Sequence, residues 1–250
     1  VGMGGSLGRT EATGYGVIFV LKDLLREMNI PVESTTASIQ GFGNVAEYAA
    51  RLYAELGGKV IAVSCWDQDD ATSYTYRKLD GCDIEQLASI KNSFGSINKD
   101  KAQDLGYEVL PGGAWICQDV DILVPAALEN QIIPCSCQQI SPKVKILCEG
   151  ANGPVTPDSD PILKDRDIIV LPDFLCNAGG VTCSYFEQVQ CNMNYFWSKE
   201  EVMEKLEYSM TKAFTAVNEL AQEKNLTLRE AAYVIAINRV VNAVKLRGWV

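Results

Sequence analysis

The sequence predicts an α/β protein with a doubly wound, Rossmann-like, mostly parallel sheet followed by C-terminal helices. Short apolar segments alternate with helical ones across residues 31–176, a glycine-rich turn follows the first of them, and the pattern becomes purely helical from residue 177. Alternation with near-continuous apolar strands is typical of a parallel sheet covered on both faces. We therefore divide the chain into a linker and first helix (1–30), a Rossmann-like core (31–176) and C-terminal helices (177–250).

Capping residues, apolar spacing and helix breakers predict the individual elements. Thr10 is expected to cap a first helix, whose apolar residues run from Val17 to Met28 before Pro31. The predicted strands are 36–40, 60–64, 121–125, 144–149 and 168–172, and the helices among them are 44–56, 83–92, 129–141 and 156–165. Segment 67–81 is polar and acidic and is expected to be an exposed loop. The final helices are expected at 177–192, 199–224 and 228–247, the last two amphipathic.

Residues 39–46 read Ile-Gln-Gly-Phe-Gly-Asn-Val-Ala, an apolar strand that runs into a Gly-x-Gly-x-x-Ala turn and a helix. In such a turn Gly41 permits the bend, Gly43 leaves room for a pyrophosphate, and Ala46 lets the helix lie close to the sheet. The free N–H groups of the helix then face the anion. Similar turns also occur for packing alone, but the following strand completes a βαβ unit, which favours nucleotide binding.

Polar or small residues follow each predicted strand. They are Gly41, Asp67 and the segments 126–130, 150–154 and 173–180. In open α/β sheets, ligands bind outside the carboxyl ends of the strands. We therefore expect these five positions to line one crevice.

Composition excludes several classes of function. The 250 residues carry a formal net charge of −10, which opposes general binding to nucleic acid or to an anionic membrane. No apolar run approaches the length of a bilayer span and no signal peptide is recognisable, so we expect a cytoplasmic protein. The chain begins in a glycine-rich stretch without an initiator Met, which suggests that a further N-terminal domain is missing.

Histidine and cysteine content limits the possible chemistry. The chain has no histidine, which excludes a Ser-His-Asp triad, a histidine general base and histidine-ligated metals within it. Its nine cysteines are scattered, without a pair of Cys-x-x-Cys motifs, and Cys135 and Cys137 alone are too few ligands for zinc. We expect buried, reduced thiols and no metal site.

Five further motifs accompany the glycine-rich turn. They are Gly-Ser-Leu-Gly-Arg-Thr-Glu-Ala-Thr-Gly-Tyr-Gly at 5–16, Pro-Ala-Ala-Leu-Glu-Asn at 125–130, Glu-Gly-Ala-Asn-Gly-Pro-Val-Thr-Pro at 149–157, Leu-Pro-Asp at 171–173 and Asn-Ala-Gly-Gly-Val-Thr-Cys-Ser-Tyr-Phe-Glu-Gln-Val-Gln at 177–190. In this order they resemble the cofactor-binding domain of the glutamate dehydrogenase family. The resemblance covers nearly the whole chain, and ordered motifs are far more specific than the glycine turn alone.

The resemblance implies contacts with both halves of a dinucleotide. Contacts with the pyrophosphate, the adenosine ribose and the adenosine side are implied for Gly41, Phe42, Gly43, Asn44, Val45, Ala126 and Ala127. Arg9 and Thr13 would lie near the nicotinamide, and Asn152 would bind its ribose or carboxamide. Two alternatives stay open: the Thr13 hydroxyl can bond the preceding helical turn, and Asn152 can serve only as a left-handed turn residue.

For the amino-acid substrate, the resemblance implies Asn177, Val181 and Ser184. Asn177 begins a helix at the cleft, and Ser184 would reach toward the side-chain carboxylate of glutamate. A solvated helix-surface hydroxyl is the alternative role for Ser184.

The chain departs from the family where an acidic residue usually ends the second strand, near Ser64. Cys65 stands there, followed by Trp-Asp-Gln-Asp-Asp at 66–70. Asp67 lies about twenty residues past Ala46, near the spacing expected for an acid that binds the ribose 2′-hydroxyl. The acidic cluster favours NAD, although Arg77 and Lys78 could fold back and accept the 2′-phosphate of NADP.

The implied reaction is the oxidative deamination of L-glutamate to 2-oxoglutarate and ammonium. In the family, the catalytic lysine, a proton-shuttling aspartate and the carboxylate-binding lysines belong to the preceding substrate domain, and no matching lysine motif occurs in this chain. We expect no catalytic residue in this chain, dinucleotide binding without activity, and a homo-oligomer for the full-length protein. The alternatives are a leucine or phenylalanine dehydrogenase with an apolar substrate pocket, and a non-catalytic dinucleotide-sensing module.

Overall fold

The computed structural model describes residues 4–249, so residues 1–3 of the predicted linker and Val250 lie outside it. The strands are β1 Thr36–Gln40, β2 Lys59–Asp67, β3 Thr72–Arg77, β4 Glu108–Pro111, β5 Ile122–Pro125, β6 Ile146–Cys148 and β7 Ile169–Leu171. The α-helices are α1 Ala12–Glu27, α2 Asn44–Glu55, α3 Ile84–Ser89, α4 Lys99–Asp104, α5 Pro134–Cys137, α6 Asp160–Asp165, α7 Asp173–Cys176, α8 Ala178–Met193, α9 Lys199–Lys224 and α10 Leu228–Leu246. The 3-10 helices are η1 Val32–Ser34, η2 Gly112–Trp115 and η3 Pro157–Ser159.

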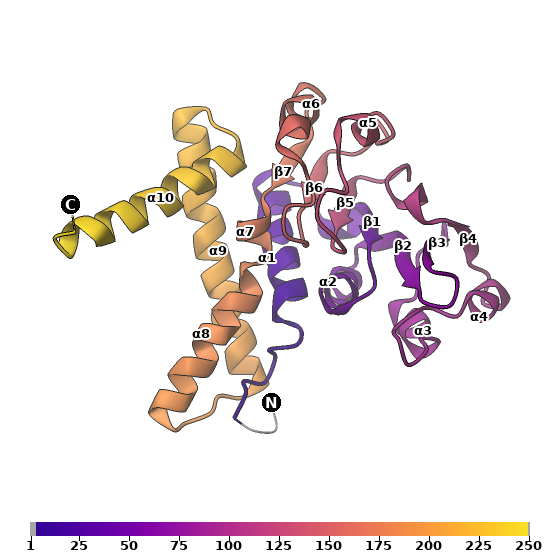
Figure 1. The fold of residues 1–250 in the computed structure, drawn as a ribbon, viewed down its shortest axis with the longest axis horizontal. Helices are drawn as coiled ribbons and strands as arrows, with labels where there is room; N and C mark the ends of the chain where they lie inside the picture. Colours follow the sequence, from indigo (N-terminus) through magenta and orange to yellow (C-terminus); the bar gives the residue numbers. More distant parts are fainter. Residues whose placement is uncertain (1–3, 250) are drawn as a thin grey trace.

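The strands form one seven-stranded sheet in the order β4-β3-β2-β1-β5-β6-β7, with helices on both sides (Figure 1). Strands β1, β2, β5, β6 and β7 run parallel, while β3 is antiparallel to both β2 and β4. The chain proceeds outward from β1 on one side and resumes at β5 on the other, so the order reverses between these two strands. The predicted doubly wound fold is confirmed, and its topological switch point lies between β1 and β5.

The prediction that residues 67–81 form an exposed loop is wrong. Strand β2 continues to Asp67, and the chain then folds back as β3. Residues 72–77 read Thr-Ser-Tyr-Thr-Tyr-Arg, and threonine and tyrosine favour strands when one face is buried. Thr75 and Tyr76 are buried, and the Tyr76 hydroxyl donates to the Ile97 carbonyl at 3.0 Å. Of the acidic residues that suggested a loop, Asp69 and Asp70 occupy the turn of this hairpin, while Asp67 ends β2 and Asp80 follows β3.

Other boundaries differ where local signals are weak. Predicted helix 129–141 is reduced to α5, and predicted helix 83–92 is the shorter α3, with Asp83 as its N-cap. Thr10 does not cap α1, which starts at Ala12 after Glu11 and lacks a side-chain cap. Helix α4, strand β4 and η2 were not predicted, whereas α9 has the expected bounds.

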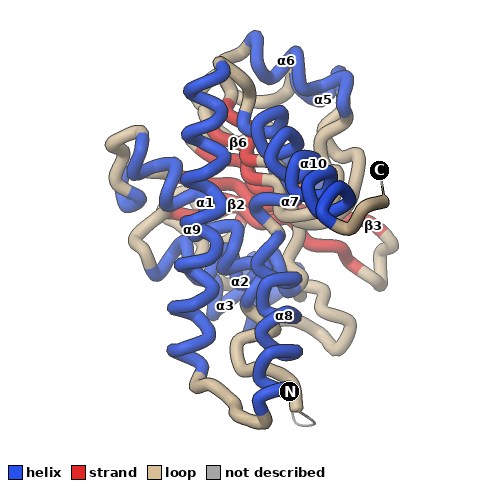
Figure 2. Tube along the Cα trace, turned by 90° about the vertical axis from the view of Figure 1, so that its left-hand side faces the viewer, coloured by secondary structure: helices blue, strands red, loops and turns tan. Residues whose placement is uncertain are grey.

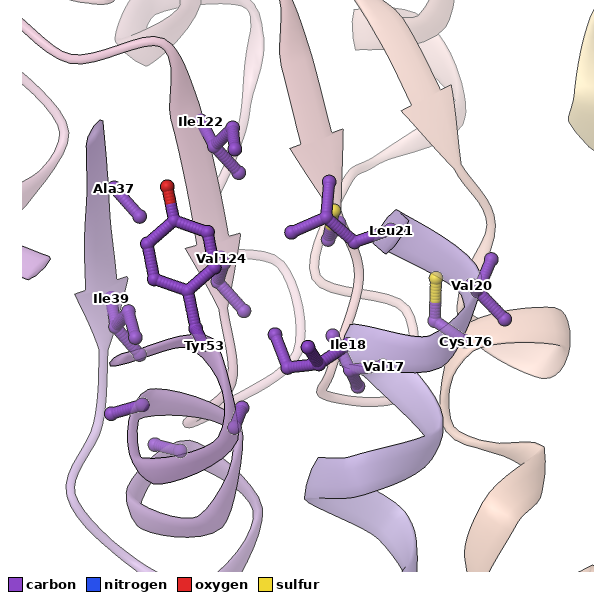
Figure 3. Close-up of a cluster of buried hydrophobic side chains, with 14 of the residues drawn as sticks. Val17, Ile18, Val20, Leu21, Ala37, Ile39, Tyr53, Ile122, Val124 and Cys176 are labelled. Carbon is purple, nitrogen blue, oxygen red and sulfur yellow. The ribbon is translucent and has the colours of Figure 1, made fainter. Parts of the chain in front are cut away.

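Two apolar clusters cover the two faces of the sheet. Figure 3 shows Tyr53 of α2 beside Ile39 and Val124 of the sheet, with Ile18 of α1 next to them. The Tyr53 hydroxyl is satisfied by Thr35 Oγ1 at 2.6 Å, so the buried ring leaves no unpaired polar group. This packing holds α2 against the sheet, and the Tyr53–Thr35 hydrogen bond fixes its last turn near the amino end of β1. The opposite face is covered from the segments around η2, α5 and α6.

The C-terminal helices extend away from the sheet. Helices α1, α8 and α9 pack together (Figure 2), and the predicted apolar stripe of α9 is buried at Val202, Leu206, Met210 and Val217. Helix α10 projects outward beyond its first turns (Figure 1), and its expected amphipathic pattern is wrong. Its exposed apolar residues are Tyr233, Val234, Ile237, Val240, Val241 and Leu246.

All nine cysteines are free, and six of them are buried. The expected burial fails at three exposed positions: Cys117, Cys135 and Cys191. Within residues 4–249, no helix is long and apolar enough to cross a membrane.

Candidate functional site

The glycine-rich turn lies at the switch point of the sheet. Gly41 follows β1 with φ +98°, and a Cβ there would lie 3.0 Å from the Ala126 carbonyl oxygen at the end of β5. Gly43 differs, because a Cβ at that position would meet nothing within 4 Å. The turn is therefore tightly packed against β5 at Gly41 and open at Gly43. Open space at Gly43 is what a ligand that approaches the backbone closely requires.

Helix α2 starts directly at the open position. Gly43 is its N-cap and no side chain caps the helix, so the first N–H groups stay available to an anion. Phe42 is buried, with Lys91 Nζ 5.3 Å from the centre of its ring. These contacts hold the turn in place.

Glu47, in the first turn of α2, is neutralised by two cations. Its carboxylate accepts from Lys91 Nζ at 2.6 Å and from Arg51 Nη2 at 2.9 Å. Burial raises the pKa of Glu47, but the hydrogen bonds from Lys91 and Arg51 outweigh this and lower the pKa below its ordinary value. The negative charge in the first turn of α2 is therefore locally compensated.

A cleft of about 740 Å³ extends from this turn toward α1 and α8. Nine of the predicted site residues line it: Arg9, Thr13, Val45, Ala126, Ala127, Asn152, Asn177, Val181 and Ser184. Leu128, Glu129, Gly150, Ala151 and Gly180 complete the lining. They lie in the segments 126–130, 150–154 and 173–180 that were expected to border the crevice, but no individual contact was predicted for them. Gly41, Phe42, Gly43 and Asn44 belong to the adjoining turn rather than to this lining.

Polar side chains from distant segments meet at the far end of the cleft. Arg9 Nε donates to Ser184 Oγ at 3.1 Å, and Ser184 Oγ donates to the Gly180 carbonyl at 3.2 Å. Asn177 Nδ2 donates to Asn152 Oδ1 at 2.8 Å. The cleft thus offers a guanidinium, a hydroxyl and two amides beside apolar residues such as Val45, Ala126 and Leu128.

Close helix packing places these side chains. A Cβ at Gly179 would lie 2.1 Å from the Ala12 carbonyl oxygen, and one at Gly180 would lie 2.4 Å from Thr13 Oγ1. On the other side of α1, a Cβ at Gly14 would lie 2.6 Å from the Val45 carbonyl oxygen. Glycines therefore allow α1 to contact both α8 and α2, a role that the motif 5–16 did not reveal.

Asp67 does not line the cleft. It is buried at the end of β2, where its Oδ1 accepts from the backbone N–H groups of Asp69 and Asp70 at 3.0 Å each. The strand β2 residue that contacts the glycine turn is Ser64, whose Oγ accepts from the Gly41 N–H at 3.1 Å. A role for Asp67 in ribose binding stays a prediction.

A buried carboxylate next to the cleft was not among the predicted site residues. Glu149 ends the apolar run of β6 and is fully buried, bonded to Arg229 of α10. Burial raises the pKa of the Glu149 carboxyl, and Arg229 opposes this rise. A charged residue at the end of an apolar strand was the available signal, but its partner lies 80 residues away.

A larger cavity, about 870 Å³, lies among α6, β7 and the turn between α9 and α10. It contains none of the predicted site residues. Its lining mixes acids and bases, among them Asp160, Lys164, Arg229 and Glu230, without a clear charge preference. In the part of the chain that is described, no group of three or more His, Cys, Asp or Glu residues is arranged to hold a metal ion.

Comparison with known proteins agrees with this geometry. The family model described as Glutamate/Leucine/Phenylalanine/Valine dehydrogenase matches residues 4–248. The chain is 41% identical over 250 residues to an NAD-specific glutamate dehydrogenase of Clostridioides difficile, covering all of this chain and 58% of that protein. It is 40% identical over 248 residues to a cryptic catabolic NAD-specific glutamate dehydrogenase of Bacillus subtilis, covering 99% of this chain and 55% of that protein.

Solved structures give the same picture. The glutamate dehydrogenase of Peptoniphilus asaccharolyticus superposes with a TM-score of 0.83 at 38% identity, over 100% of this chain and 56% of that one. The hetero-hexameric glutamate dehydrogenase of Thermus thermophilus superposes with a TM-score of 0.87 at 28% identity, over 98% of this chain and 55% of that one. The chain thus spans little more than half the length of these relatives. It belongs to the Glutamate/Leucine/Phenylalanine/Valine dehydrogenase family.

Proposed function

We propose that this chain is the NAD-binding part of a glutamate dehydrogenase, which converts L-glutamate to 2-oxoglutarate and ammonium. The observation that carries the proposal is the cleft at the switch point, open above Gly43 and beside an uncapped helix start. Backbone N–H groups of α2 would hold the diphosphate, with Ala126 and Ala127 along the adenosine side. NAD, when bound, would accept hydride from the substrate α-carbon.

The far end of the cleft would hold the nicotinamide and the substrate. Thr13 would bind the nicotinamide carboxamide and Asn152 the nicotinamide ribose or carboxamide, with Arg9 nearby. The Arg9–Ser184 pair beside exposed Val181 favours a carboxylate-bearing side chain over the apolar side chain of a leucine or phenylalanine substrate. The task of these residues is to align donor and acceptor carbons and exclude water.

The charge distribution supports NAD over NADP. Arg77 pairs with Glu108, while Lys78 Nζ donates to the Leu105 carbonyl at 3.2 Å and lies over the Tyr107 ring. Both cations that could have bound a 2′-phosphate are therefore engaged along β3 and β4. The acidic turn after Asp67 would further repel that phosphate.

We further propose that a second domain supplies the catalytic lysine, the proton-shuttling aspartate and the lysines that bind substrate carboxylates. Relatives of nearly twice this length, and the absence of the family's glycine-flanked lysine motif from this sequence, support this division. The exposed apolar side chains of α10 would be covered in the whole protein, either by that domain or by another subunit of a homo-oligomer. Closure of the two domains would complete the site.

Calorimetric titration of the 250-residue chain with NAD and NADP tests the proposal. We expect saturable binding, tighter for NAD, and no oxidation of glutamate by this chain alone. Failure to bind either dinucleotide would overturn the cofactor role, and turnover by the chain alone would overturn the division between two domains. Glutamate oxidation by the full-length protein separates an enzyme from a dinucleotide-sensing module.

A further inference from the structure

Glu149 is a fully buried carboxylate that directly precedes the cleft-lining residues Gly150, Ala151 and Asn152. A buried charge is costly unless it is paired and hydrogen-bonded. Its position at the carboxyl end of β6 therefore needs an explanation beyond strand formation. The explanation lies in a helix from the other end of the chain.

Arg229, on the first turn of α10, makes two parallel hydrogen bonds to Glu149. Nη1 donates to Oε2 at 2.9 Å and Nη2 donates to Oε1 at 2.8 Å, the bidentate geometry that fixes both position and orientation. The Asp173 N–H adds a third hydrogen bond to Oε2, at 2.7 Å. Arg229 Nε also pairs with Asp160 Oδ2 at 2.9 Å. All these groups are more than half buried.

The same network reaches the other end of the 150–153 segment. Asp173 Oδ2 accepts from the Gly153 N–H at 2.9 Å, while the N–H groups of Gly150 and Ala151 both donate to the Pro125 carbonyl at 3.0 Å. Asn152 is thus held between two anchored ends, and its amide contacts Asn177. Arg229 itself does not line the cleft; its side chain borders the separate cavity at the α9–α10 turn.

We propose that Arg229 is a positioning residue for the nicotinamide-ribose end of the cleft. Arg229 fixes the position of the Glu149 carboxylate, which in turn holds the Asp173 N–H. These contacts fix the backbone conformation of 150–153 and the orientation of the Asn152 amide. This inference rests on the proposed function, which gives Asn152 its role. It also couples α10 to the cofactor site through a buried ion pair rather than through direct contact.

The diphosphate end has only an indirect link to this network. It is formed by β1, the glycine turn and α2, and it meets the 150–153 segment through the pairing of β1 with β5 and through packing of Gly150 near Ala126 and Val45. Loss of Arg229 should therefore affect NAD much more than ADP, which carries adenosine and diphosphate without the nicotinamide ribose. General loosening of the fold would affect both ligands.

The test compares the dissociation constants of NAD and ADP in R229M, in R229K and in the matched control R166M. Arg166 bonds the Cys137 and Ile140 carbonyls on the far side of the sheet, so R166M also removes a partly buried guanidinium. We expect R229M to weaken NAD binding about tenfold and ADP binding less than about twofold, since displacing Asn152 should cost about one hydrogen bond to the nicotinamide half of NAD. R229K should fall between, and R166M should leave both affinities unchanged.

The double variant E149M/R229M separates positioning from stability. Replacing both partners of a buried ion pair by apolar residues removes the unpaired charge, so stability should return toward that of the original chain. NAD affinity should stay low, because the directional contacts are absent. Equal weakening of NAD and ADP, or recovery of NAD affinity in the double variant, would overturn the inference. If the unaltered chain bound no NAD, the proposed function itself would fail.

Discussion

The proposed diphosphate end of the cleft comes from one contiguous stretch of chain, whereas the proposed nicotinamide end is assembled from stretches far apart in the sequence. At the first end, β1, Gly41, Gly43 and α2 all lie within residues 36–55. At the second, Arg9 contacts Ser184 and Arg229 contacts Glu149, 175 and 80 residues apart. The first end depends on local backbone geometry and the second on helix packing, so substitutions should affect them in different ways.

The largest effect is expected from Gly179→Ala at the assembled end. Its Cβ would lie 2.1 Å from the Ala12 carbonyl oxygen, so α8 must move away from α1. We expect a loss of about 3 kcal/mol in unfolding free energy, measured by denaturant titration, because overpacking against backbone has few ways to relax. Gly113→Ala is the control, since its Cβ would meet nothing within 4 Å. A difference between the two variants below about 1 kcal/mol would contradict this packing.

Gly43→Ala should show the opposite pattern, because it changes binding more than stability. The added Cβ occupies open space, so the unfolding free energy should fall by less than about 1 kcal/mol. NAD and ADP should both bind about tenfold more weakly, equivalent to about 1.4 kcal/mol. If NAD bound more weakly while ADP affinity was unchanged, the diphosphate would have to bind elsewhere. Together with R229M, this variant separates the two ends of the cleft by their response to ADP.

Glu47→Gln tests the electrostatics of the contiguous end. Loss of the contacts with Lys91 and Arg51 should lower stability at pH 7 by about 1 kcal/mol. The pKa of Glu47 is lowered in the folded protein, so this stability is complete above its ordinary pKa of 4.5 and is lost as pH falls further. Urea titrations from pH 7 to pH 3 should show the gap between variant and original chain closing below pH 4.5. A gap that is independent of pH would exclude the ionic explanation.

The smallest effect is expected from Asp67→Asn. Asparagine can still accept the two N–H bonds in the β2–β3 turn, so stability should change by less than about 0.5 kcal/mol. Removing one negative charge should improve NADP relative to NAD by about twofold, as expected for a partly screened interaction. Calorimetry with both cofactors measures the ratio. A fall in NAD affinity alone would instead indicate direct contact between Asp67 and the ribose.

The outcome at β3 explains why part of the fold could not be predicted. Residues 72–77 have good strand propensity, but the acidic residues before them suggested a solvated loop. These residues form a strand because Thr75 and Tyr76 are buried against elements further along the chain. Strand propensity depends on such packing, so it is weakly visible in the sequence. The amphipathic pattern predicted for α10 was wrong for a related reason, because apolar residues beyond its first turns, such as Ile237, Val240 and Leu246, are exposed.

The sequence by itself determined the order of the five parallel strands, the bounds of α9 and the glycine turn at Gly41 and Gly43. These features depend on hydrogen bonds and steric limits between residues that are close together in the sequence. Such local interactions can be inferred from the residue types alone. Only the tertiary structure decided that Asp67 serves a hairpin turn, that glycines bring α1 against α8, and that Arg229 pairs with Glu149. Each of these features requires two segments of the chain to pack together. The free energy of that packing depends on burial and geometry that neither segment has alone.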